Sequence, residues 1–337
     1  MIDTIGTPTL WAVTIAGVLA LLVVDFIATR KPHEVSMREA VAWSAFYVAI
    51  PLAFGLYVWS QHGGERGVEY YTGYLVEKSL SVDNLFVFML LLAAFAVPAA
   101  LQQRVLLYGI VGALVLRGIF IALGAAALSA FDWVFLVFGA VLLVTGVKLL
   151  KDALSGDDHA EKDVSSMRTV RLLRRVMPVA DEYDGPRLLT RVGGARALTP
   201  FAVVTVAVLA TDIVFAIDSV PAVYGITGDP YLVFATNAFA LLGLRALYFV
   251  LRGALSKLVH LGFGLAAILG FIGVKLVLHW AHLVWPSVPE IPTLASLGVI
   301  VGILAVTTTT SLIASRRAEA AGSPAGREPE EERSVVG

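Results

Sequence analysis

Apolar runs of about 20 residues recur along the whole chain and limit its fold more than any other feature. A helix of this length crosses about 30 Å of hydrocarbon. Only 15% of the residues are charged, whereas soluble domains usually carry about 25%. The sequence therefore predicts an all-α protein that crosses a membrane many times, and it excludes soluble, fibrous and disordered classes.

About nine transmembrane helices are expected from the apolar windows. They cover residues 10–29, 38–60, 70–97, 101–128, 132–150, 199–222, 231–251, 257–281 and 293–314. This pattern predicts four segments: spans 1–5 in residues 1–150, a connecting segment in 151–197, spans 6–9 in 198–314, and a disordered tail in 315–337.

The basic residues outside these spans gather on one side of the membrane. Nineteen of the 25 Lys and Arg residues lie in one alternating set of loops, whereas Arg66 alone lies in the opposite set. Cytoplasmic loops carry an excess of Lys and Arg. We therefore expect a plasma-membrane protein with its N-terminus outside and with the connecting segment and the C-terminus in the cytoplasm.

The connecting segment contains a pattern typical of a β-hairpin. Residues 187–192 and 195–199 flank Gly193-Gly194, which suits a two-residue turn. The same residues also fit an irregular loop. The basic run from Arg168 to Arg175 either lies against anionic headgroups or forms the solvated face of a helix.

Two parts of the chain repeat one another. Residues 138–148 align with 265–275 without a gap, and Leu116-Arg117 aligns with Leu244-Arg245 further upstream. Spans 3–5 and 6–8 are thus two copies of one unit.

The same order continues in two pairs of acidic residues. Glu77 and Asp83 lie six residues apart in span 3, and Asp212 and Asp218 lie six apart in span 6. Because each copy has three spans, the copies must point in opposite directions across the bilayer. Such inverted repeats are typical of secondary transporters, which bind substrate near the midplane between the repeats.

Ten ionisable residues remain inside the expected spans, where each costs about 3 kcal/mol or more at the centre of the bilayer. The acids are Asp25, Glu77, Asp83, Asp212 and Asp218, and the bases are Lys78, Arg117, Lys148, Arg245 and Lys275. Charges at this cost must pair, line water or bind a ligand. Arg117 and Arg245 cannot lose their protons, so we expect them to pair with carboxylates as structural or gating counter-charges.

The acids lie among other oxygen donors. Glu77 shares a helix face with Asn84, and Asn237 lies in the span after Asp212. Pro221 lacks an amide proton, so we expect a local opening of span 6 that frees a backbone carbonyl.

Hard oxygen donors suit Mg²⁺, Ca²⁺ and Mn²⁺, and the absence of cysteine excludes thiolate ligands. Three interpretations of the acids remain: a metal site, salt bridges that hold the bundle together, or proton carriers without a metal.

Three motifs resemble those of the TerC family of integral membrane proteins. They are Glu77-Lys-Ser-Leu-Ser-Val-Asp-Asn-Leu-Phe-Val-Phe88, Asp212-Ile-Val-Phe-Ala-Ile-Asp-Ser-Val-Pro-Ala222 and Phe234-Ala-Thr-Asn-Ala-Phe-Ala-Leu-Leu-Gly-Leu-Arg-Ala-Leu-Tyr248. The segment 30–36 after Asp25 also looks like the family's first loop, and the likeness runs from about Leu21 to about Leu312.

This resemblance implies a carrier associated with tellurite resistance and manganese export. It implies no prosthetic group, and its transported ion is expected to be Mn²⁺. By motif match, the implied ligands are Asp25, Glu77, Asp83, Asn84, Asp212, Asp218 and Asn237. The chain departs from the family at Leu209, where an acidic residue is common, and this leaves the ion preference and the coordination number open.

The expected function is therefore the export of divalent cations through an acidic midplane site, not an enzymatic reaction. The expected partners are the lipid bilayer and the metal ion, and nucleic acid is not among them. The alternative is a non-transporting scaffold, or a factor for membrane-protein assembly or stress resistance. Exported metalloenzymes or assembly factors would then dock on residues 151–197.

Overall fold

The computed structural model describes residues 4–28, 36–155, 178–180, 182–192, 195–251 and 259–320. These residues form ten α-helices and one two-stranded sheet. The elements are α1 (Pro8–Ala28), α2 (Met37–His62), α3 (Gly64–Ala94), α4 (Ala99–Ala130), α5 (Val134–Ser155), β1 (Leu189–Val192), β2 (Ala195–Leu198), α7 (Pro200–Tyr224), α8 (Pro230–Leu242), α9 (Leu244–Leu251), α10 (Leu261–Val284) and α11 (Thr293–Ala320).

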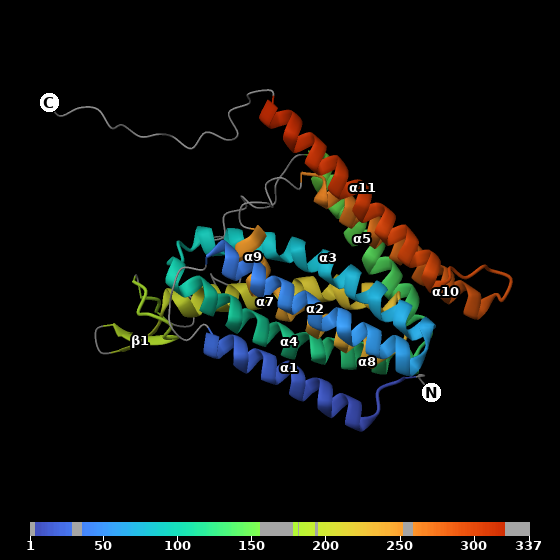
Figure 1. The fold of residues 1–337 in the computed structure, drawn as a ribbon, viewed down its shortest axis with the longest axis horizontal. Coiled ribbons are helices and arrows are strands. Elements are labelled where there is room, and N and C mark those ends of the chain that lie inside the picture. Colours follow the sequence, from blue (N-terminus) through green and yellow to red (C-terminus); the bar gives the residue numbers. More distant parts are fainter. Residues whose placement is uncertain are drawn as a thin grey trace.

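Most of the helices run lengthwise in one bundle, and α5, α10 and α11 form an inclined group beside it (Figure 1). Large apolar side chains on the outer helices face away from the protein, among them Val13 on α1, Leu56 on α2 and Val306 on α11. An outward apolar surface of this kind is stable in lipid rather than in water. The protein is thus an all-α, polytopic membrane protein, as the sequence predicted.

Within the described residues, seven helices are long and apolar enough to cross a membrane, and the bent pair of α8 and α9 passes the same test when it is counted as one span. The ninth expected span is α3, which carries Glu77, Lys78 and Asp83 and is therefore less apolar. Helices α2, α7 and α8 pack around α3, so Glu77 is fully buried in protein.

The end of the chain differs from the prediction. The sequence placed a disordered tail from residue 315, whereas α11 continues to Ala320. Residues 316–320 are two arginines, two alanines and one glutamate, which are good helix formers and extend the helix past its apolar part. The rest of the predicted tail lies outside the described residues.

The contact between α5 and α10 shows that the two repeats are inverted. Gly139 of α5 lies against Gly273 of α10, and Gly146 lies against Ala266. The two helices are therefore antiparallel, because rising numbers in one meet falling numbers in the other. In the repeat alignment, Gly139 is equivalent to Ala266 and Gly146 to Gly273. Gly139 thus contacts the equivalent of Gly146, and Gly146 contacts the equivalent of Gly139. This is the pattern of a two-fold axis that passes between the two helices.

The middle helix of the second repeat is broken. Helix α4 runs without interruption through Val115, whereas a bend of 41° separates α8 from α9 at the equivalent Gly243. The opening that the sequence predicted at Pro221 is not where this repeat bends, because α7 continues as one helix across Pro221 to Tyr224.

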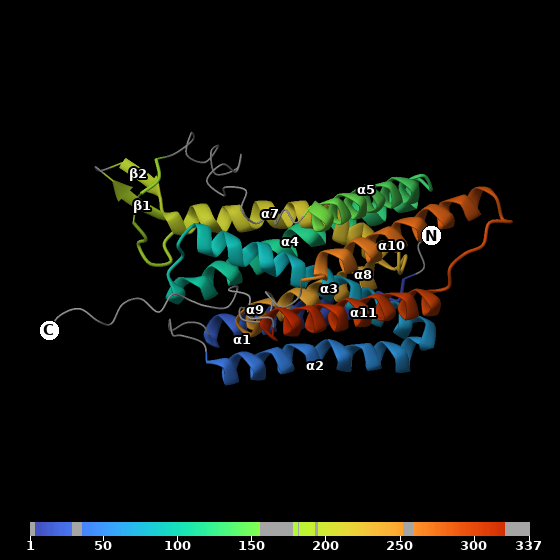
Figure 2. The same cartoon turned by 90° about the horizontal axis from the view of Figure 1, so that it is seen from above.

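A β-hairpin precedes α7, at the place where the sequence predicted one. Strands β1 and β2 are antiparallel, with Leu189 opposite Leu198 and Val192 opposite Ala195. This register leaves two residues for the turn, and both lie outside the described residues. The hairpin lies beyond the end of the bundle, at its edge (Figure 2).

Candidate functional site

The guanidinium of Arg117 lies at the centre of a cluster of buried oxygen atoms between the repeats. It donates to Oε1 of Glu77, to Oδ1 of Asn237 at 2.9 Å and to Oδ1 of Asp212 at 3.2 Å. In the amide orientation that satisfies both its ends, Asn84 donates to the Leu80 carbonyl and accepts from Arg117 Nη2 at 3.2 Å. We call the four side chains Glu77, Asn84, Asp212 and Asn237 the oxygen cage.

Three helices form this cage, and a fourth supplies the arginine at its centre. Glu77 and Asn84 lie two turns apart on one face of α3. Asp212 comes from α7, Asn237 from α8, and the central Arg117 from α4. The Nδ2 atom of Asn237 donates to the Val233 carbonyl at 2.9 Å, which turns its oxygen toward the guanidinium. Contacts within their own helices thus orient the amide oxygens of Asn84 and Asn237 toward the guanidinium.

The cage carries more negative than positive charge. Glu77 and Asp212 supply two carboxylates against one guanidinium, and all three residues are at most 1% exposed. One oxygen of each carboxylate, Glu77 Oε2 and Asp212 Oδ2, is buried without a hydrogen-bond partner in the described part of the chain. A buried unpaired oxygen is costly, so the two carboxylates favour more positive charge than one guanidinium supplies, or a proton.

The second buried arginine forms a separate ion pair. The Nε atom of Arg245 lies 3.0 and 2.9 Å from the two carboxylate oxygens of Asp25, and Nη2 also donates to Oδ1. The Tyr47 hydroxyl donates to the same carboxylate at 3.2 Å, and Gln103 accepts from Arg245 at 3.4 Å. Both arginines thus have the carboxylate partners that the sequence required.

A half-buried lysine contacts the break between α8 and α9. Lys78 Nζ donates to the carbonyl of Ala240 at 3.1 Å, near the C-terminus of α8, where carbonyls lack intrahelical donors. A Cβ atom on Gly243 would lie 3.2 Å from Lys78 Nζ and 3.0 Å from Tyr47 Cβ. Glycine at the break therefore lets Lys78 and Tyr47 approach the chain closely.

The seven ligands that the resemblance implied are not gathered at one place. Glu77, Asn84, Asp212 and Asn237 form the cage, whereas Asp25 belongs to the pair with Arg245. Asp218 lies outside the cage but within electrostatic range of Arg117 and Glu77. Asp83 is only partly buried and stands outside both clusters.

The oxygen atoms are not yet arranged as a metal site. Within the described ranges, no group of three or more His, Asp and Glu side chains lies close enough together to hold a metal ion. The position between the two carboxylates is filled by Arg117. Leu209 packs against Gly112 of α4, where an acidic residue would add a further carboxylate.

Sequence reasoning did not assign a role to Lys78, Tyr47 or Gln103. Lys78 follows Glu77 directly and was one of the ten intramembrane charges. The cost of placing its charge in lipid therefore indicated that it needs a buried partner. Tyr47 and Gln103 are uncharged, and the sequence contains nothing that pairs them with Arg245.

The chain matches a known family over most of its length. The profile of the integral membrane protein TerC family matches residues 62–319. An uncharacterised membrane protein of Myxococcus xanthus, STKORF319, is 42% identical over 93% of this chain and 95% of that protein. An Escherichia coli K12 protein named "Putative membrane-bound redox modulator Alx" is 41% identical over 90% of this chain and 94% of that protein. No solved structure matches the chain.

Proposed function

Because the chain belongs to the integral membrane protein TerC family, we propose that it is a carrier of divalent cations. Its expected substrate is Mn²⁺, and the expected direction is export across the plasma membrane. The N-terminus then lies outside the cell and the C-terminus in the cytoplasm, in keeping with the distribution of Lys and Arg.

The oxygen cage is the observation that supports this proposal most. Four buried oxygen donors, two of them carboxylates, already surround one cation, which is the guanidinium of Arg117. Carboxylate and amide oxygens are also the donors that Mn²⁺, Mg²⁺ and Ca²⁺ prefer. Glu77 and Asp212 occupy equivalent places in the inverted repeats, and transporters of this architecture bind substrate at the repeat interface.

In this mechanism Arg117 and the metal ion exclude one another. With the guanidinium in the cage, the charges of Glu77 and Asp212 are partly balanced and the site is closed to the ion. When the ion enters, its two positive charges balance both carboxylates and the guanidinium withdraws. Asp218 lies within electrostatic range and offers the displaced guanidinium a second carboxylate. This exchange avoids an uncompensated buried charge.

The name of the Escherichia coli relative points to redox balance, and this is compatible with a metal carrier. The present chain contains no cysteine, so it has no thiol of its own to oxidise. An effect on redox state would follow from the cellular level of the ion that it carries.

Uptake of ⁵⁴Mn²⁺ into everted membrane vesicles tests the proposal, because export from a cell becomes uptake in this orientation. We expect uptake with the wild-type protein and background rates with Glu77→Gln and Asp212→Asn. The matched control is Glu290→Gln, which removes an exposed carboxylate bonded to His279 and should leave uptake unchanged.

Equal uptake by the wild type and Asp212→Asn would contradict the cage as the transport site. Background uptake by properly inserted wild-type protein would contradict transport itself and favour a scaffold or assembly factor. Uptake of Mg²⁺ or Ca²⁺ in preference to Mn²⁺ would contradict only the choice of ion.

A further inference from the structure

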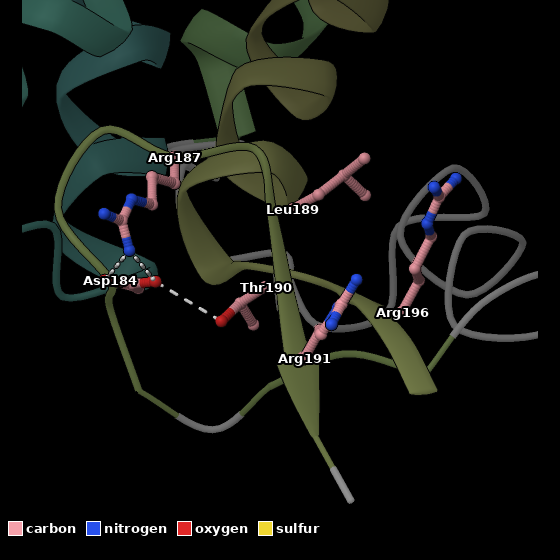
Figure 3. A pocket seen from close by; sticks show the side chains of 6 residues that line it. All are labelled: Asp184, Arg187, Leu189, Thr190, Arg191 and Arg196. Carbon is pink, nitrogen blue, oxygen red and sulfur yellow. Dashed lines mark hydrogen bonds and ion pairs between the residues drawn. The ribbon is translucent and has the colours of Figure 1, made fainter. Parts of the chain in front are cut away.

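A cavity of about 540 Å³ opens beside the hairpin (Figure 3). Six residues line it: Asp184, Arg187, Leu189, Thr190, Arg191 and Arg196. The carboxylate of Asp184 already has partners within the cavity, because it pairs with Arg187 at 3.2 Å and accepts a hydrogen bond from Thr190 at 3.3 Å. The lining therefore keeps an excess of two positive charges.

Arg191 and Arg196 carry this excess charge. They are directly opposite one another in the antiparallel register, so their side chains lie on the same face of the hairpin. Both are exposed, and no described carboxylate forms an ion pair with either of them. Like charges directly opposite each other destabilise a strand pair. An anion between them would remove that repulsion.

The hairpin is held rigidly against the helices. Val179, Tyr183 and Leu198 pack on the apolar core formed by α3, α4 and α7, and the Tyr183 hydroxyl donates to the Phe95 carbonyl at 2.8 Å. Burial raises the pKa of the Tyr183 phenol above its usual value, so the hydroxyl stays protonated and remains a donor. The two arginines are thus presented by a fixed support, which lowers the entropic cost of binding.

Exposed leucines lie next to the arginines. Leu188 and Leu189 are each 49% exposed, and β2 ends at Leu198, two residues before the transmembrane helix α7 begins. Figure 2 shows the hairpin beyond the end of the bundle, on the side where α7 lies. Apolar side chains beside basic ones at this level are typical of contact with the membrane interface.

We propose that this cavity binds the phosphate of an anionic phospholipid between Arg191 and Arg196, while Leu188 and Leu189 contact its glycerol and upper acyl chain. The distribution of Lys and Arg predicts that the hairpin faces the cytoplasm, where the leaflet supplies anionic headgroups. The bound lipid fixes the beginning of α7, the helix that carries Asp212. A soluble phosphate compound would use the arginines but gain nothing from the exposed leucines, so the surface fits the lipid better.

Native mass spectrometry of the purified full-length protein, released from detergent, tests this site. The probe is phosphatidylglycerol, and phosphatidylcholine with the same acyl chains is the neutral comparison. We expect the double variant Arg191→Gln/Arg196→Gln to bind phosphatidylglycerol about thirtyfold more weakly than the wild type, with little change for phosphatidylcholine. The charge-matched control is Arg38→Gln/Arg316→Gln, which removes two arginines elsewhere and should bind phosphatidylglycerol like the wild type.

Two further measurements distinguish a bound lipid from other bound anions. Leu188→Ser/Leu189→Ser should weaken phosphatidylglycerol binding, and millimolar glycerol phosphate should not displace the lipid from the wild type. Equal losses in the hairpin variant and the control would overturn the site. Full displacement by glycerol phosphate would overturn the lipid as the ligand. Neither outcome depends on ⁵⁴Mn²⁺ uptake, so this test is independent of the proposed function.

Discussion

Arg117 and Arg245 occupy equivalent positions in the two repeats, yet they bind different partners. Arg117 lies on the unbroken helix α4 and reaches Glu77 of its own repeat and Asp212 of the other repeat. Arg245 lies just after the break at Gly243 and reaches Asp25 on α1, outside the repeats. Two copies of one unit therefore adopt two conformations in one molecule.

Three residues account for this difference: Gly243 and Lys78 face different residue types at the equivalent positions of the other repeat, and Asp25 lies outside the repeats. Gly243 permits the bend where α4 has Val115, and Lys78 binds the Ala240 carbonyl at the break, whereas Ile213 is its equivalent on α7. Asp25 then pairs with Arg245, which the bend directs away from the oxygen cage. The comparison shows how an inverted repeat becomes asymmetric, which alternating access requires.

The largest expected effect comes from removing each arginine. Arg117→Met leaves two buried carboxylates uncompensated, and Arg245→Met leaves one, so both should lose about 3–5 kcal/mol of stability. Mn²⁺ at 100 times its dissociation constant should restore about 2.7 kcal/mol to Arg117→Met alone, because the ion replaces the guanidinium in the cage. Thermal unfolding in detergent with and without Mn²⁺ measures this.

Arg117→Lys is a milder variant for the case in which Arg117→Met does not fold. Equal stabilisation of the Arg117 and Arg245 variants by Mn²⁺ would contradict the distinction between the two clusters.

The break itself can be tested through Lys78. Lys78→Met leaves the buried Ala240 carbonyl without this donor, which should cost about 1–3 kcal/mol. Ile213→Met changes the equivalent residue of the second repeat, a partly lipid-exposed side chain, and should change stability by less than about 0.5 kcal/mol. The same unfolding assay compares them, and an equal effect of the two substitutions would show that Lys78 does not stabilise the break.

The two outer acids should differ in their effect on transport. Asp218 lies within electrostatic range of Arg117, so Asp218→Asn should reduce ⁵⁴Mn²⁺ uptake about five- to tenfold through a loss on the order of 1 kcal/mol. Asp83→Asn should have a smaller effect, because Asp83 lies outside the cage. The reverse order of the two rates would place the transport path on the Asp83 side of α3.

The smallest expected effect is that of Tyr47. Tyr47→Phe removes one hydrogen bond to Asp25 while the bond to Arg245 remains, so it should cost about 0.5–1.5 kcal/mol of stability. Uptake of ⁵⁴Mn²⁺ should stay at the wild-type rate, because the Asp25 pair is separate from the cage. A loss of uptake without a loss of stability would instead assign Asp25 to the transport path.

The cluster around Arg117 was only partly predictable. The sequence predicted that Arg117 needs carboxylate partners, and the spacing of Glu77 and Asn84 placed these two on one face of α3. It did not separate Asp25 from the other acids, because all of them carry the same cost in an apolar span. The break at Gly243 was not predicted, and α7 continues as one helix across Pro221, since proline removes one hydrogen bond without requiring a sharp turn.

The sequence alone determined the all-α membrane class, the repeats and the ten charges that need partners, because these follow from hydropathy and from the order of residues along the chain. Only the tertiary structure decided which acid faces which arginine. Helix periodicity relates residues within one helix, whereas the rotation and depth of each helix relative to its neighbours depend on packing of the whole bundle. The break at Gly243 was also decided by the tertiary structure, because contacts from Lys78, Tyr47 and Asp25 on three other helices support it.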